Sequence, residues 1–174
     1  ALTPAQLGGL SVANLTSLSA TQFAALTPTL VKGLSATQLG GLSATDFARF
    51  STTQIVSLTA PQIGSLSATN VAGLDATVIQ QLSATQLQGL TAFQVRSLGA
   101  GDVQEFTATQ IAALTPAQFG SFSATALPAL FDTQFAALSS AQIGAMSATG
   151  LASLTNTQLG WLSATQLKGV SATA

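Results

Sequence analysis

The chain has 174 residues, 47% of them hydrophobic, and a mean hydropathy of +0.51, which excludes ordinary disorder because disordered segments combine low hydrophobicity with high charge. Only 5% of the residues are charged and the net charge is −1, so there is no basic surface for nucleic acid or anionic lipid. The absence of Cys, His and Tyr removes the common zinc and haem ligands, thiol chemistry and the usual general base.

An eight-residue unit repeats along the whole chain from Leu2 onward without an insertion. Position one of this octad is always apolar, as in Leu34 and Leu42, and position six is apolar as well, as in Leu39 and Phe47. Residues 2–169 therefore hold 21 complete octads, and residues 170–174 a partial one. Because a fixed period is typical of stacked repeats, we expect one continuous solenoid over residues 1–174.

The spacing of the two apolar positions favours helix over strand. They are separated by five and then three residues, which would place them on opposite faces of a strand. A short helix explains the same spacing without a corner or bulge in every octad. The sequence thus predicts an all-α repeat solenoid, with a β-solenoid as the alternative.

Helix starts are marked by position two, which is Ser or Thr in 18 of the 21 octads, the residues preferred as N-caps. Position five is Gln in 13 of 21, so that Ser/Thr-x-x-Gln forms a capping box, and positions one and six are placed to form a hydrophobic staple. The structural caps that we expect include Ser35 with Gln38, Ser43, Ser83 with Gln86, and Ser163 with Gln166.

Helix ends are expected at positions seven and eight, which are mostly Gly, Ala or Ser, as in Gly40 and Gly41. Small residues there let the helix stop and let neighbouring units pack closely. Each octad is thus predicted to be an α- or 3₁₀-helix of about one and a half turns. Pro128, at position seven, indicates an early end in its octad.

Position five also bears on how many octads form one coil. Its clearest departures from an amide fall in every third octad counted from that of Gln6, although Gln54 in the same series keeps the amide. This favours three octads per coil, with two octads per coil as the alternative. The departures are Leu30, Val78, Asp102, Ala126 and Gly150.

No catalytic, cofactor or metal site is predicted, and we expect the protein not to be an enzyme. A serine nucleophile would lack a histidine base. Asp102 with Glu105, Asp75 and Asp132 could supply calcium oxygens, but no calcium-loop spacing accompanies them, so a solvated face is preferred. The scattered cations Lys32, Arg49, Arg96 and Lys168 are interpreted as solubilising.

Two aromatic residues stand where the octad is usually small or polar. Phe93 occupies position four and Trp161 position eight, so both are candidates for an exposed contact patch. Packing against local neighbours is the preferred interpretation of the two residues.

The SATQL, TPAQL and TPAQF units resemble the octapeptide repeats of bacterial secreted and surface proteins, some of them adhesin-like. The resemblance implies an extracellular or cell-surface stalk or filament. We expect a structural repeat protein that binds no nucleic acid or small-molecule substrate and does not insert into membranes. Because neither end carries a polar capping repeat, the ends should stack on another copy or continue into a longer chain.

Ice binding is the alternative function, since low charge with regular Thr and Ala resembles antifreeze composition. An ice-binding surface should be one flat face rich in Thr. Sorting position four by three octads per coil gives Thr in 5, 5 and 4 of seven octads, so no face is singled out.

Overall fold

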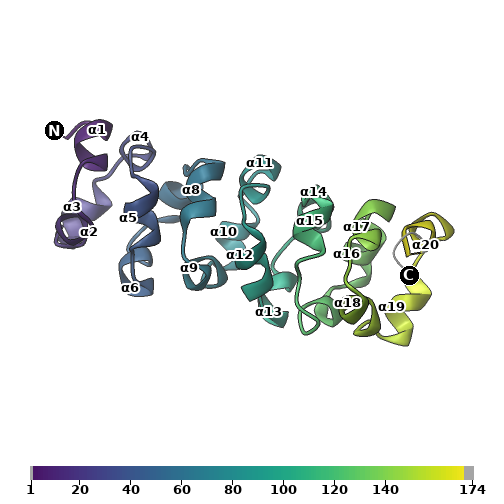
Figure 1. Cartoon of the computed structure of the whole chain (residues 1–174). Helices are drawn as coiled ribbons and strands as arrows, with labels where there is room; N and C mark the ends of the chain where they lie inside the picture. Colours follow the sequence, from purple (N-terminus) through teal and green to yellow (C-terminus); the bar gives the residue numbers. More distant parts are fainter. Residues whose placement is uncertain (1, 171–174) are drawn as a thin grey trace. The chain divides into compact units, whose positions relative to one another are not determined.

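The computed structural model describes residues 2–170 (Figure 1). This part of the chain forms twenty α-helices of four to seven residues and one 3₁₀-helix, and contains no strand. The expectation of an all-α repeat is confirmed, and the β-solenoid alternative is wrong.

The chain divides into two compact units, Ala1–Gly89 and Leu90–Ala174. The first contains α1 (Pro4–Gly8), α2 (Val12–Thr16), α3 (Ala20–Ala24), α4 (Pro28–Val31), α5 (Ala36–Gly40), α6 (Ala44–Phe47), α7 (Thr52–Ile55), α8 (Ala60–Ser65), α9 (Ala68–Ala72), α10 (Ala76–Ile79) and α11 (Ala84–Leu87). The second contains α12 (Ala92–Ser97), α13 (Ala100–Gln104), α14 (Ala108–Ala113), α15 (Pro116–Phe119), η1 (Leu127–Ala129), α16 (Asp132–Ala136), α17 (Ser140–Gly144), α18 (Ala148–Ala152), α19 (Asn156–Trp161) and α20 (Ala164–Val170).

Each octad contributes one helix, and α5 shows how the sequence starts it. Ser35 is extended, with φ −77° and ψ 159°, and its Oγ accepts a hydrogen bond from the backbone N–H of Gln38 at 3.2 Å. The Oε1 atom of Gln38 accepts from the N–H of Ser35 at 2.8 Å. Two N–H groups that the helix leaves unpaired are thereby satisfied.

The octad that begins at Phe122 forms the 3₁₀-helix η1 instead of an α-helix. Pro128 lies inside it and has no N–H to donate to the carbonyl four residues earlier. The octad thus lacks a regular α-helix, but η1 ends at Ala129, at position eight, so the early end expected from Pro128 is not found.

Helices end without the special conformations of glycine. Gly41, which follows α5, has φ −88° and ψ −4°, and Ala25 follows α3 with nearly the same angles, −78° and −5°. Among residues 2–170 no residue has a positive φ. The small residues at positions seven and eight therefore have another role, which is to let helices that stack on one another approach closely.

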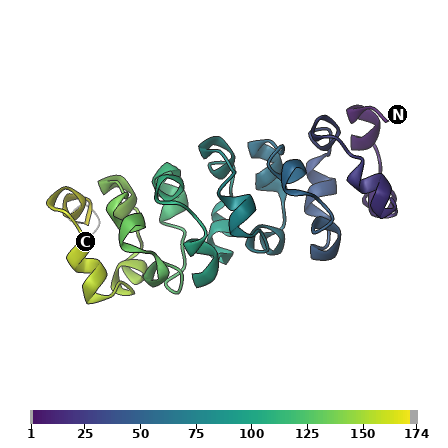
Figure 2. The same cartoon turned by 180° about the vertical axis from the view of Figure 1, so that it is seen from behind.

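Within each unit, the main contacts join helices that are three octads apart in the sequence (Figures 1 and 2). In the first unit these pairs are α1 with α4, α2 with α5, α4 with α7, α5 with α8, α6 with α9, α7 with α10, and α8 with α11. In the second they are α12 with α15, α13 with η1, α14 with α16, α15 with α17, α16 with α19, and α17 with α20. The side chains at positions one and six form the core between these layers, as Leu39 and Leu42 do at 0% and 3% exposure.

Candidate functional site

We call the contact between two octads that stack on one another the joint. Gln38 shows how it is built. This side chain is only 2% exposed. Its Nε2 donates to the backbone carbonyl oxygens of Leu7 and Leu10, each 2.8 Å away and 31 and 28 residues earlier. Since its Oε1 already holds the cap of α5, one side chain both starts its own helix and ties that helix to the preceding layer.

The same joint recurs in both units. Amides at position five donate to the carbonyls 28 and 31 residues earlier at N–O distances between 2.7 and 3.4 Å, and each of these side chains is at most 7% exposed. They belong to Gln54, Gln62, Gln134, Gln142, Gln158 and Gln166.

The sequence predicts only a capping role for these glutamines, although a signal for their second role is present in it. A capping box needs only an acceptor oxygen, which Glu also supplies. No octad has Glu at position five. The preference for Gln over Glu at this position is explained by the amide, which also carries N–H donors for the layer beneath.

Arg49 and Asp46 replace the amide in the octad that begins at Leu42. Asp46 occupies position five, and the carbonyl of Leu18, which corresponds to that of Leu10 in the joint of Gln38, is bound by the Nη2 of Arg49. Nη1 of Arg49 donates to the carbonyl of Thr16 at 3.0 Å and lies 3.7 Å from Asp46 Oδ1. The guanidinium also lies 4.2 Å from the ring centroid of Phe23. Arg49 is thus part of the joint and not simply a solubilising cation.

Small residues at positions seven and eight allow the layers to approach. A Cβ added to Gly120 would lie 2.2 Å from the carbonyl oxygen of Ala145, which belongs to the third octad after it. One added to Gly144 would lie 2.9 Å from the carbonyl oxygen of Gly169, in the same register. These distances are shorter than any van der Waals contact, so the close packing expected from the small residues is found.

The remaining caps have the same local geometry. Ser43 Oγ accepts from the N–H of Asp46 at 3.1 Å. Ser83 and Gln86 bond reciprocally at 3.3 and 2.9 Å, and Gln86 Nε2 also donates to the Leu58 carbonyl at 2.7 Å. Ser163 and Gln166 bond reciprocally at 3.3 and 2.9 Å.

The two aromatic candidates differ in their surroundings. Phe93, on α12, is 70% exposed. Trp161, at the end of α19, is 39% exposed, and its ring centroid lies 5.9 Å from that of Phe135. Among the residues described, no ring contact joins the two, so they are not shown to form one patch.

The acidic residues considered for calcium serve their own octads. Asp75 Oδ1 accepts from the N–H of Val78 at 3.0 Å, and Asp102 Oδ2 accepts from that of Gly99 at 2.7 Å. Asp132 Oδ1 accepts from the N–H of Thr133 at 2.7 Å. Within residues 2–170, no three His, Cys, Asp or Glu side chains come together as a metal site.

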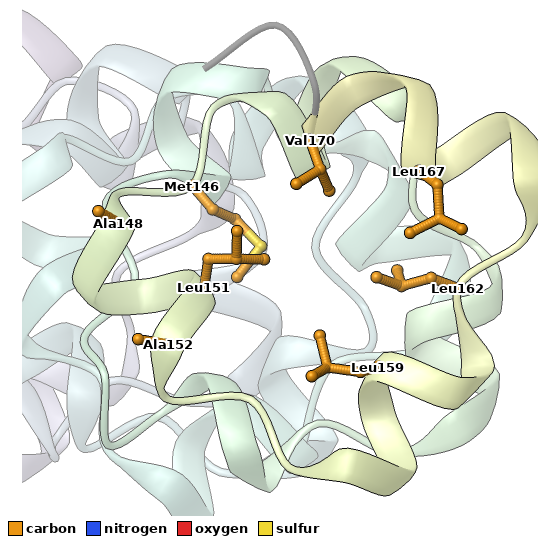
Figure 3. Close-up of a pocket in the computed structure, with 8 residues that line it drawn as sticks. All are labelled: Met146, Ala148, Leu151, Ala152, Leu159, Leu162, Leu167 and Val170. Carbon is orange, nitrogen blue, oxygen red and sulfur yellow. The ribbon is translucent and has the colours of Figure 1, made fainter. Parts of the chain in front are cut away.

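An apolar hollow of about 410 Å³ lies among α18, α19 and α20 (Figure 3). Its wall consists of two alanines and the side chains of Met146, Leu151, Leu159, Leu162, Leu167 and Val170. Leu151, Leu159, Leu162 and Val170 point into the same space (Figure 3). The hollow offers apolar surface and no charged group, so it is suited to binding an apolar side chain and not to chemistry.

Comparison with known proteins finds a match to a repeat family. The model of the ALTTAQ repeat matches residues 111–148, which run from α14 to the start of α18. This supports the assignment of a repeat-protein motif. No match was found among curated proteins or among solved structures. No helix in the described part of the chain has both the length and the apolar character needed to cross a membrane.

Proposed function

We propose that the protein is a non-enzymatic structural repeat protein, a stalk or filament module at the bacterial cell surface. In this proposal three octads complete one coil of a solenoid. The joint described above supports it, because the same side-chain positions join successive layers in both units. The polar groups of that joint bond to one another, and its repetition extends the chain one layer at a time.

The contact register supports three octads per coil over two. The position-five amides reach carbonyls 28 and 31 residues earlier, as Gln54 reaches those of Leu26 and Phe23. A coil of two octads would instead bring together helices that are two octads apart in the sequence. The side chain of Gln104 also contacts the third octad after its own, because it donates to the Ala129 carbonyl 25 residues later at 3.0 Å.

Disulfide trapping tests the coil length, because the chain contains no cysteine of its own. At the position equivalent to the Gln104–Ala129 pair, a Cβ on Gly120 would lie 3.3 Å from that of Ala145, close to the spacing a disulfide requires. The double variant Gln104→Cys with Ala129→Cys should therefore cross-link on oxidation. Gln104→Cys with Ser121→Cys, which a two-octad coil would join, should not. The reverse result would overturn three octads per coil.

Surface labelling tests the proposed location. Intact cells of a bacterium that produces the protein are treated with an amine reagent that does not cross membranes. Lys32 is exposed and should react, whereas a cytoplasmic marker protein should not. Lys32 that becomes labelled only after the cells are broken would contradict the cell-surface assignment.

A further inference from the structure

Gly150 occupies position five of the octad that begins at Met146, so this octad brings no amide to its joint. In the register of the other joints, a glutamine there would donate to the carbonyl oxygens of Phe122 and Phe119, 28 and 31 residues earlier. Among the described residues, the carbonyl of Phe122 receives no hydrogen bond, and that of Phe119 receives one only from the N–H of Phe122. Both acceptors of this joint therefore lack the donor that a complete joint supplies.

The oxygen of the missing amide has left a donor without its partner as well. In α5 the N–H of Ser35 donates to Oε1 of Gln38, whereas the N–H of Ser147, the cap residue of α18, has no acceptor among the described residues. Oγ of Ser147 still accepts from the N–H of Gly150 at 3.0 Å, so half of the cap is present. One carboxamide would therefore satisfy groups on both sides of this joint.

A hollow of about 320 Å³ lies at this place, and we call it the Gly150 hollow. Its wall includes Phe122, Ser147 and Gly150, further serine and threonine residues, and Arg96. A Cβ on Gly150 would lie 3.0 Å from Cδ1 of Leu127, so Leu127 fills part of the space of the missing side chain. In the described part of the second unit, the main contacts between helices three octads apart do not include η1 with α18, which this joint would tie together.

A missing amide is accompanied by a hollow in the first unit too. Val78 occupies position five of its octad, and Phe50 and Phe47 are the residues 28 and 31 positions earlier. All three line a hollow of about 220 Å³. Two separate joints without an amide thus each have a hollow beside the residues that would accept from it. The Gly150 hollow is the larger, and no side chain at position five enters it.

We propose that the Gly150 hollow binds a primary carboxamide, the group that complete joints carry at this place. The NH₂ group of the ligand donates to the carbonyls of Phe122 and Phe119, and its oxygen accepts from the N–H of Ser147. Arg96 is exposed and forms no hydrogen bond or ion pair with another described residue, so its guanidinium is available to the same oxygen. A glutamine side chain of another protein and a small free amide both supply this group. The inference goes beyond the proposed structural function, because it adds a binding site to one layer.

Three related small ligands test the chemistry of the site. Propionamide, titrated into the isotope-labelled full chain, should shift the NMR signal of the Ser147 N–H in a saturable manner. N,N-dimethylpropionamide has no N–H to donate, and propionate would place an oxygen against the carbonyls of Phe122 and Phe119. Both should therefore bind about tenfold more weakly or less. Propionate that binds more tightly than propionamide would assign the hollow to an anion held by Arg96 and overturn the proposal.

Filling the site from within the chain tests its position. Gly150→Gln supplies the amide and should abolish propionamide binding, and its Ser147 N–H signal should move toward that of the liganded chain. The matched control is Gly101→Gln, because Gly101 is exposed and a Cβ there meets nothing within 4 Å. Binding that survives in a folded Gly150→Gln chain, or that is lost in both variants, would overturn the proposal. If circular dichroism shows that Gly150→Gln does not fold, the three ligands on the unaltered chain decide the case.

A pair of peptides separates the two sources of the carboxamide. N-acetyl-Ala-Gln-Ala-methylamide carries one primary amide, on its side chain, and the matched peptide has Glu in place of Gln. Binding of the Gln peptide about tenfold more tightly than propionamide would assign the site to a side chain of another protein, and weaker binding would assign it to a small amide. Equal binding of the Gln and Glu peptides, or no binding of either the Gln peptide or propionamide, would overturn the proposal. The disulfide test of the solenoid does not involve this hollow, so the structural function is judged separately.

Discussion

The side-chain nitrogen of Gln38 lies 2.8 Å from the carbonyl oxygen of Leu10, a residue 28 positions earlier in the chain. Gln38, which the sequence predicts only as part of a local cap, therefore also forms a tertiary hydrogen bond. Because the acceptor is a backbone atom, the contact places no demand on the side chain that it meets.

Replacing the amide of Gln38 by a carboxylate separates its two roles. Gln38→Glu keeps one oxygen as the acceptor for the cap. Its second oxygen takes the place of the amide nitrogen and faces the carbonyl oxygens of Leu7 and Leu10 in a buried site. The free energy of unfolding of the first unit should fall by about 3 kcal/mol or more, since an uncompensated buried charge is strongly destabilising. Gln22→Glu is the matched control, because Gln22 is exposed and serves only its capping box, and it should change stability by about 0.5 kcal/mol or less. Urea unfolding followed by circular dichroism measures both.

The defect of Gln38→Glu should depend on pH. Burial raises the pKa of a carboxyl group above its value in the unfolded chain. The penalty is therefore present at neutral pH and lessens as pH falls through the raised folded-state pKa, because the protonated group regains a donor. Unfolding measured from pH 7 to pH 4 should show the variant approaching the unaltered chain. A difference independent of pH would contradict a buried charge as the cause.

Two glycines at position seven allow a matched test of layer spacing. Gly120→Ala places a methyl group 2.2 Å from the Ala145 carbonyl oxygen and should destabilise the second unit by about 1–3 kcal/mol. Gly160→Ala meets nothing within 4 Å and should be neutral or stabilise by up to about 1 kcal/mol, because it restricts the unfolded chain. Equal losses from the two variants in thermal unfolding would show that steric contact is not the reason for glycine.

The ion pair of Asp46 and Arg49 should be exchangeable for one glutamine. Arg49→Ala alone leaves the carbonyls of Thr16 and Leu18 without their donors and should cost about 1–3 kcal/mol. Adding Asp46→Gln places an amide in the register of Gln38 and should recover most of that loss. A double-mutant cycle in urea unfolding measures the coupling. No recovery in the double variant would mean that the octad requires the guanidinium itself.

One octad is capped poorly, and this can be improved. Phe131 occupies the cap position of α16 without a side-chain acceptor and is 49% exposed. Phe131→Ser should restore the cap and stabilise the second unit by about 0.5–2 kcal/mol. The control Phe131→Ala removes the ring without adding an acceptor, so a gain of equal size in both variants would point to the ring and not to the cap.

The sequence was sufficient for the local fold. Cap residues such as Ser35 and a first-turn proline such as Pro28 act within one octad, so their consequences can be derived from neighbouring residues. The apolar positions one and six also identified the core correctly. The 3₁₀-helix in the octad of Pro128 has a local cause as well, although the early end expected there is not found.

The joint was not predicted in detail, for physical reasons. Gln38 donates to main-chain carbonyls, and these leave no mark in the sequence of the layer that accepts. Arg49 reaches across 31 residues to compensate for Asp46, which no local pattern connects. The glycines were attributed partly to helix ends, whereas Gly120 is small because of a carbonyl in the third octad after it.

The absence of any positive φ among residues 2–170 has an evolutionary consequence. No turn in this part of the chain depends on a backbone conformation that only glycine readily adopts. The acceptors in the joint are backbone atoms common to all residues. An octad that carries the position-five amide and small residues at positions seven and eight can therefore be copied by gene duplication and pack on its new neighbours through backbone acceptors. Unequal recombination could lengthen or shorten such a gene by whole octads, and selection could then act on the length of the protein.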